Sequence, residues 1–301
     1  MSGNQLKLIA LILMTIDHIH NFVPNMPIYF SYLGRMAYPI FAFCCVQSYF
    51  YTRNVKKYLV RLYIANVITS FVFYAVNLRY GENDLFGRNI VNNIFTTLFQ
   101  MVLLVYVIDT VIHKTCGYRK FFISYGIYQM LLYIVVEWIA SSDSVPLFET
   151  YLLSHLFCNL WHTEGSRFYI FLGVIFYFGY REPKGSKKKI AIFYVIYCIG
   201  YFFIYYGNIL QRIFLRIALY ISPQVRDIAV KATSYVLQLD EVWCNRWKEY
   251  SLFGNDCAWM MVFAVLFLLL YNGKKGKNMK WLFYIYYPAH IIILFLAGSY
   301  L

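Results

Sequence analysis

The sequence predicts an all-α fold, a polytopic transmembrane helical bundle of about nine spans with a cytoplasmic N-terminus. Three observations support this prediction. Hydrophobic residues fill 61% of the 301 positions and charged residues only 14%, whereas soluble domains carry roughly a quarter charged residues. The apolar residues fall in runs long enough to cross a hydrocarbon core of about 30 Å. Lys and Arg gather between alternate runs, as in cytoplasmic loops.

About nine apolar runs qualify as spans, and they organise residues 1–301 as a single membrane-embedded domain. The first run follows Lys7. Because Asp17 and His18 interrupt it and no small-residue cleavage site follows, we interpret it as a retained span rather than a signal peptide. The predicted spans are 6–24, 33–52, 59–77, 90–112, 121–140, 166–180, 190–207, 257–272 and 281–300.

The loop charges predict the orientation. With the N-terminus inside, every internal segment carries Lys or Arg, as the positive-inside rule requires, and Glu182 is the one acid among them. This distribution accounts for the formal charge of +13, so we expect no nucleic-acid partner. The internal segments are 1–7, 53–61, 113–120, 181–189 and 272–280.

Two regions do not fit as spans. Residues 147–162 are too short, and residues 208–256 form a predicted external, partly amphipathic insertion. Within the insertion, Arg212 and Arg216 share one face of an apolar helix, which favours a helix lying in the outer interface. For both regions, including 208–222, re-entry into the protein interior stays open. Pairing of Cys244 with Cys257 in this external loop is also open.

Ionisable groups inside spans are costly and therefore mark candidate sites. Asp17 and His18 lie past the middle of the first span, and Arg35 lies near the outer end of the second. Glu137 lies toward the outer end of the fifth span, and His290 is in the middle of the last. All lie from the midplane outward, so we expect these helices to contribute to one pocket open to the exterior.

An imidazole next to a carboxylate is the composition of a general base with an orienting group. Adjacent helical residues point about 100° apart, so Asp17 need not touch His18, and Arg35 is the natural ion partner for Asp17. Asn93 lies at the outer part of the fourth span, on the expected acceptor side. Glu137 either pairs with Arg35 or lies at the headgroup level. A helix places Lys7 about 16 Å from His18, half of the hydrocarbon core. A lysine at the inner surface could bind a phosphorylated donor whose reactive arm reaches the midplane. Alternatively, Lys7 only follows the positive-inside rule.

Several segments resemble the TraX family of membrane acyltransferases, whose founding member is the F-pilin N-terminal acetylase and which is distantly similar to the acyltransferase-3 families. The resemblance covers both ends and the first four spans, and the middle of the chain, especially 208–256, is not matched. The segments are KLIALILMTIDHIH, LGRMAYPIFAFCCVQSYFYTRNVKKYLVRLYI, NNIFTTLFQMVLLVYVID and LLLYNGKKGKNMKWLFYIYYPAHIIILFL.

The resemblance implies transfer of an acetyl or similar acyl group from cytoplasmic acyl-CoA, with acetyl-CoA as the first candidate and no metal. The acceptor would be an amine or hydroxyl at the outer side, on a pilin-like protein, a glycan or a small molecule. It implies a multi-pass protein of a bacterial inner or cytoplasmic membrane, surrounded by lipids. The basic residue and histidine ten residues apart in acyltransferase-3 families match Lys7 and His18.

The implied roles follow residue by residue. His18 would be general base or acyl carrier.

Two other functions stay open. One is a proton-coupled secondary transporter that uses Asp17, His18 and Glu137, and the other is an assembly scaffold without catalysis. The sequence has no clean Arg-x-x-Arg pair where those families carry one. The expected catalytic residues are His18, Asp17, His290 and Arg35, and the expected donor-binding residues are Lys7, Arg53, Lys57 and Arg61.

Overall fold

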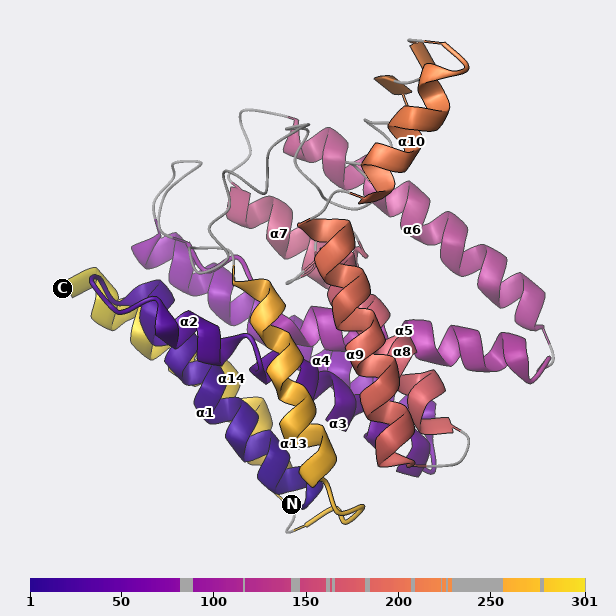
Figure 1. The fold of residues 1–301 in the computed structure, drawn as a ribbon. Coiled ribbons are helices and arrows are strands. Elements are labelled where there is room, and N and C mark those ends of the chain that lie inside the picture. Colours follow the sequence, from indigo (N-terminus) through magenta and orange to yellow (C-terminus); the bar gives the residue numbers. More distant parts are fainter. Residues whose placement is uncertain are drawn as a thin grey trace.

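A computed structural model describes residues 1–81, 89–115, 117–141, 147–160, 163, 166–181, 185–206, 209–222, 224–225, 227–228, 257–276 and 279–300. Every regular element in these ranges is a helix (Figure 1). The elements are α1 (Gly3–Phe22), α2 (Tyr29–Gly34), α3 (Ala37–Tyr51), α4 (Val55–Tyr80), α5 (Ile94–Ile112), α6 (Tyr118–Ala140), α7 (Leu147–Leu156), α8 (Ser166–Arg181), α9 (Lys187–Tyr205), α10 (Ile209–Leu219), η1 (Ala258–Phe263), α13 (Ala264–Leu270) and α14 (Lys280–Tyr300).

Within the described ranges, five helices are long and apolar enough to cross a membrane, namely α4, α5, α6, α9 and α14. Two shorter apolar helical stretches cover 168–181 and 258–270. The all-helical fold and the membrane class are therefore confirmed. The number of spans and the side of the N-terminus stay predictions. The second predicted span is not one helix, because the chain breaks between α2 and α3 at Arg35 and Met36.

Polar caps define where several helices begin. Ser2 and Gln5 form a capping box at the start of α1, each side chain bonding the other's backbone N–H. Asn54, Asn93 and Ser186 cap α4, α5 and α9 in the same way, by accepting from a first-turn N–H. Such caps satisfy donors that have no partner inside the helix.

The start of α1 meets the loop between α13 and α14 at one end of the bundle. Gly3 N donates to the Lys274 carbonyl at 2.8 Å and Asn4 N to the Lys275 carbonyl at 3.0 Å, while Asn272 N donates to the Met1 carbonyl at 2.8 Å. These backbone hydrogen bonds hold the start of α1 against the loop between α13 and α14. We call this the basic end of the bundle, because Lys274 and Lys275 lie there with Lys7 one or two turns inside.

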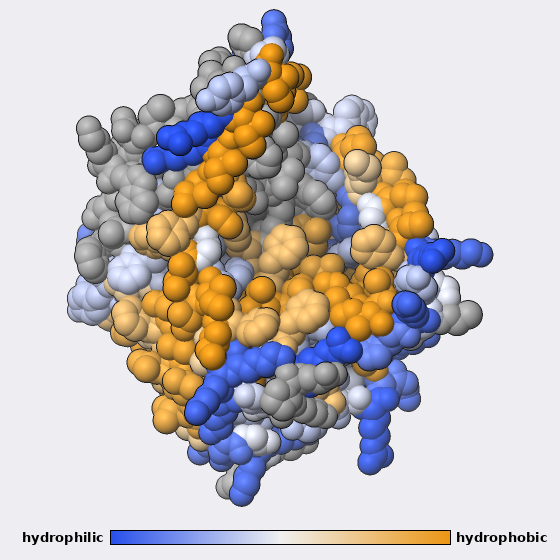
Figure 2. Space-filling model, turned by 45° about the vertical axis from the view of Figure 1, so that its right-hand side comes forward, coloured by the Kyte–Doolittle hydropathy of each residue, from blue (hydrophilic) through white to orange (hydrophobic). Residues whose placement is uncertain are grey.

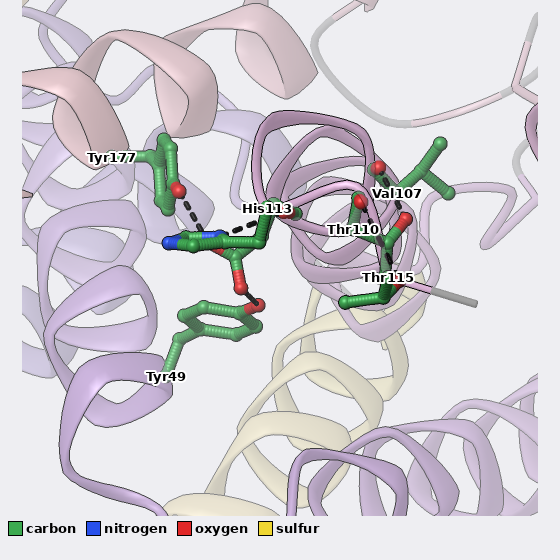
Figure 3. Close-up of polar contacts among 7 residues, drawn as sticks. Tyr49, Val107, Thr110, His113, Thr115 and Tyr177 are labelled. Atoms are coloured by element: carbon green, nitrogen blue, oxygen red, sulfur yellow. Dashed lines mark hydrogen bonds and ion pairs between the residues drawn. The ribbon is translucent and has the colours of Figure 1, made fainter. Parts of the chain in front are cut away.

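A half-buried carboxylate connects three helices near the same end (Figure 3). Asp109 of α5 accepts a hydrogen bond from the Tyr49 hydroxyl of α3 at 2.8 Å and another from the Tyr177 hydroxyl of α8. Its Oδ1 also lies 3.2 Å from Nδ1 of His113, one turn along α5. Asp109 therefore has a packing role that the sequence analysis did not assign to any acid in this span.

The segment 147–160 enters the protein interior. The short helix α7 packs against α4 and α6, and Ser154 and His155 are buried. Its carbonyls accept hydrogen bonds from amide side chains of the surrounding helices. Asn66 Nδ2 donates to the His155 carbonyl at 2.7 Å, and Gln100 and Gln129 both donate to the Cys158 carbonyl. Of the two alternatives for this region, the structure has re-entry.

The helix α10 packs against α9 and projects beyond it at the top of Figure 1. Arg212 and Arg216 are both exposed, as are Ile213 and Ile217 on the neighbouring stripe. This amphipathic character agrees with the interfacial prediction. The remainder of the insertion from 229 to 256, including Cys244, lies outside the described residues, and Cys257 is a buried free thiol.

The helix α6 stands apart from α8 and α9 (Figure 1). Only 11% of its apolar window is buried, against 61% for α5. Side-chain hydrogen bonds tether it instead. The Tyr125 hydroxyl donates to Gln100 Oε1 at 3.2 Å, and the Tyr128 hydroxyl donates to the Phe157 carbonyl at 2.6 Å. Seen with the α6 side turned forward, the surface is mostly apolar and hollowed (Figure 2), as expected for a lipid-facing protein.

Candidate functional site: two joined cavities along α1

The first cavity has a volume of about 390 Å³ and contains the predicted histidine, so we call it the histidine cavity. The second half of α1, the break between α2 and α3, the segment before α5 and the helix α14 form its walls. Its lining residues are Met14, Asp17, His18, Asn21, Phe22, Gly34, Arg35, Ala37, Tyr38, Phe41, Asn89, Ile90, Val91, Asn92, Ile94, Tyr169, Tyr287 and Ile291.

His18 and His290 form a hydrogen-bonded pair at this cavity. Nδ1 of His18 lies 2.8 Å from Nε2 of His290, and the two rings stack at 5.0 Å. Nδ1 of His290 lies 2.8 Å from the Tyr286 carbonyl, which can only accept. His290 therefore carries its proton on Nδ1 and accepts at Nε2, so His18 donates from Nδ1. This assignment leaves Nε2 of His18 unprotonated, with a free lone pair.

A second layer of contacts fixes the pair. The Thr15 hydroxyl donates to the Leu11 carbonyl at 2.8 Å, so the Tyr286 hydroxyl, 2.8 Å from Thr15 Oγ1, must donate to it. This bond joins α1 to α14 one turn from the imidazoles. The His290 ring also stacks on Tyr286 at 5.0 Å. Neither imidazole can therefore turn without breaking a bond between the first and last helices.

Asp17 and Arg35 are connected through a third side chain. The Ser31 hydroxyl donates to Asp17 Oδ1 at 2.8 Å, and Arg35 Nη2 donates to Ser31 Oγ at 3.1 Å. The predicted direct Asp17–Arg35 contact is therefore replaced by a hydroxyl bridge. Gly34 makes this possible, because a Cβ there would lie 2.1 Å from Asp17 Cβ. Within the described part of the chain, Arg35 Nε has no hydrogen-bond partner.

The second cavity lies at the basic end and has a volume of about 470 Å³, so we call it the basic cavity. Lys7 Nζ lies 5.5 Å above the Phe283 ring, and the Arg61 guanidinium lies 5.8 Å from the Tyr58 ring centre. The lining residues are Gly3, Asn4, Lys7, Leu11, Met14, Phe41, Cys45, Gln47, Ser48, Tyr51, Thr52, Tyr58, Arg61, Leu62, Ile94, Phe95, Leu98, Gly273, Lys275, Phe283, Tyr284 and Tyr287.

The two cavities are neighbours with a common wall. Met14, Phe41, Ile94 and Tyr287 line both of them. The helix α1 runs along both, with Lys7 in the basic cavity and His18 in the histidine cavity, about 16 Å apart along its axis. A cationic chamber and an imidazole chamber are thus separated by a few side chains.

The structure brings together most, but not all, of the predicted site. Asp17, His18, Arg35 and His290 meet around the histidine cavity, and Lys7 and Arg61 line the basic cavity. Four of the predicted residues lie elsewhere than expected. Arg53 and Lys57 are exposed and line neither cavity. Glu137 lies on α6, which packs on α5 and α7, and lines neither cavity.

Asn93 is the fourth of these residues. Its amide donates to Ser70 Oγ at 2.8 Å and to Asn66 Oδ1 at 2.9 Å, while its carbonyl oxygen caps α5. These contacts use the side chain in packing, and the neighbouring Asn92 lines the histidine cavity instead. Sequence reasoning missed Ser31, although its spacing of four before Arg35 on a helix was a usable signal.

Two comparisons with known proteins found matches to this chain. The family model described as "TraX protein" matches residues 2–207. A protein of Dichelobacter nodosus, named "Probable fimbrial assembly protein FimC, serogroup H1", is 24% identical over 312 residues, covering 100% of this chain and 97% of that protein. No solved structure matches. Since the family model spans more than half of the chain, and its matched range holds α1, both cavities' α3 and α5 walls and Arg35, this protein belongs to the TraX family.

Proposed function

We propose that this protein is a membrane acyltransferase that moves an acetyl or similar acyl group from acyl-CoA in the basic cavity to an acceptor in the histidine cavity. The observation that carries the proposal is the common wall of Met14, Phe41, Ile94 and Tyr287 between a cationic and an imidazole chamber. A transferase that joins substrates from opposite sides of a membrane needs two such chambers meeting at its catalytic group.

Three cations suit the basic cavity to a phosphorylated donor. Lys7, Arg61 and Lys275 line it, and among the residues that the structure describes no Asp or Glu does. The aromatic and aliphatic remainder of the lining suits the donor's less polar arm. In the predicted orientation this end faces the cytoplasm, where acyl-CoA is made available, and the histidine cavity faces outward.

His18 is the group that would move the proton. The acceptor nitrogen or oxygen attacks the thioester carbonyl and forms a new C–N or C–O bond. Nε2 of His18 takes the acceptor's proton, the C–S bond breaks, and the CoA sulfur leaves with that proton. His290 acts as a positioning residue, because its Nε2 accepts from His18 Nδ1 and thereby keeps the His18 Nε2 lone pair free. Arg35, held by Ser31 beside the cavity, would stabilise negative charge on the carbonyl oxygen.

The acceptor we favour is the amine of a pilin-type protein. The TraX family is associated with pilin modification, and the relative from Dichelobacter nodosus is named a fimbrial assembly protein. Asp17 lines the histidine cavity and is available to an amine through the oxygen that Ser31 does not occupy.

The transporter alternative has less support. It needed Glu137 in one relay with Asp17 and His18, but Glu137 belongs to α6, which packs on α5 and α7. A scaffold without catalysis would not require the hydrogen-bonded pair of His18 and His290 inside the bundle.

Purified protein in lipid nanodiscs tests the proposal. Acetyl-CoA binding is measured by calorimetry, and release of free CoA thiol is followed with and without a peptide carrying a pilin N-terminus. His18→Ala should bind acetyl-CoA normally and lose roughly 10²–10⁴-fold in thiol release. His20→Ala is the matched control, since His20 is on the same helix, bonds the Met26 carbonyl and lines neither cavity. Full activity of a stably folded His18→Ala variant would reject the mechanism.

A further inference from the structure

We propose that the wall between the cavities selects the donor by the length of its acyl chain, with Met14 as the residue that limits that length. This inference rests on the proposed function. The donor's thioester carbonyl must reach His18 from the basic cavity, and the shared residues are what it must pass. The acyl carbons beyond the carbonyl then lie in the histidine cavity, which the same four side chains also line.

One half of the wall is rigid. The Tyr287 hydroxyl accepts a hydrogen bond from Ile94 N at 2.9 Å. This bond fixes the Tyr287 side chain, on α14, to the start of α5. The Tyr287 ring packs on Phe73 and Phe95 and meets the His290 ring edge-on at 5.9 Å. Tyr287 is only 3% exposed and Ile94 9%. Neither residue can withdraw to admit a longer chain without releasing an N–H of the first turn of α5.

The other half consists of Met14 and Phe41. Met14 is buried and lies one turn before His18 on α1, so the two side chains point to the same side of the helix. Apolar carbons attached to a carbonyl held near His18 therefore meet the Met14 thioether first. A methionine fills irregular space well, so we expect its thioether to limit how far an acyl chain extends beside His18.

A hydrophobic site discriminates one added methylene by roughly 10- to 200-fold. Butyryl exceeds acetyl by two methylenes, so wild-type protein should prefer acetyl-CoA over butyryl-CoA by about 100-fold or more in kcat/KM for thiol release. Met14→Ala removes the end of the side chain and should raise the butyryl-to-acetyl ratio by about tenfold. Phe41→Leu, on the facing helix α3, should raise it by a smaller factor.

Leu11→Ala is the matched control. Leu11 is buried on the same helix, one turn closer to Lys7. It lines the basic cavity but not the histidine cavity. It would contact the part of the donor that all acyl-CoAs share, so its loss should alter KM for both donors equally and leave their ratio unchanged.

The experiment measures binding and thiol release for acetyl-, propionyl- and butyryl-CoA with wild type, Met14→Ala, Phe41→Leu and Leu11→Ala. A ratio that rises in Met14→Ala but not in Leu11→Ala supports the inference. Equal use of all three donors by wild type, or an equal ratio in Met14→Ala and Leu11→Ala, overturns it while leaving the acyltransferase proposal standing. Absence of binding for all three donors would instead remove both.

Discussion

Replacing His290 tests whether the histidine pair works as the hydrogen bonds indicate. His290 lines neither cavity, and its ring reaches the chemistry only by accepting from His18 Nδ1. His290→Leu removes that acceptor while keeping an apolar side chain in α14. His18 is then free to carry its proton on either nitrogen and to turn away from the cavity. His290→Gln keeps an amide oxygen that can accept, so it should restore much of the lost rate.

The magnitudes separate this role from a purely structural one. Orientation of a general base contributes part of the roughly 10²–10⁴-fold available to such catalysis, so kcat should fall by about 10²-fold in His290→Leu. KM for acetyl-CoA should not change, because Lys7 and Arg61 are untouched. Loss of the two neutral hydrogen bonds, to His18 and to the Tyr286 carbonyl, should cost about 1–3 kcal/mol of stability, which is less than the roughly 5–15 kcal/mol that stabilises a typical folded domain.

Steady-state thiol release across a series of acetyl-CoA concentrations gives kcat and KM, and thermal unfolding in nanodiscs gives the stability of each variant. A structural role predicts a lower melting temperature with proportionate loss in both His290 variants. If His290→Leu retained wild-type kcat, or if His290→Gln were no better than His290→Leu, the assigned hydrogen-bond direction would have no catalytic consequence.

Three further predictions concern the walls and the frame of the site. Gly34→Ala should destabilise the protein by about 1–3 kcal/mol, measured by thermal unfolding, because its Cβ would overlap Asp17; an unchanged melting temperature would contradict this. Lys7→Glu should weaken acetyl-CoA binding, measured by calorimetry, by about fivefold or more, since one charge near a membrane surface is worth about 1 kcal/mol. The control Lys57→Glu, whose side chain is exposed outside the cavity, should bind acetyl-CoA normally. Asp109→Asn should lower stability by about 1–3 kcal/mol with no change in KM for acetyl-CoA, and a changed KM would show that Asp109 acts on the site.

The helices were predictable because their apolar runs are long and their loops are basic. The group of Asp17, His18, Arg35 and His290 was predictable as well, because the cost of ionisable side chains in lipid singles them out. The hydrogen bonds that join Asp17 to Arg35 were not predictable. A bridging hydroxyl such as Ser31 carries no energetic signature in the sequence, and its partner is set by how closely α2 approaches α1.

The other placements that differ from the expectation have a common physical origin. Arg53 and Lys57 were assigned to the donor because they are basic and near the right end, but positive-inside charge alone puts lysines there. Depth along a helix does not reveal which way a side chain faces. Glu137 has a depth like that of the other site residues but belongs to a helix on the far side of α5 from α1.

The re-entrant segment has a consequence for how the protein is made. In membranes, helices insert first and associate afterwards. Asn66, Gln100 and Gln129 belong to three different spans, and each finds its partner in the 155–160 backbone. These amides enter the bilayer before that backbone can reach them, because 147–160 follows all three helices along the chain. We therefore expect α7 to insert last among the helices of this half of the bundle. Its insertion is favourable because the amide groups of these helices have no hydrogen-bond partner in lipid.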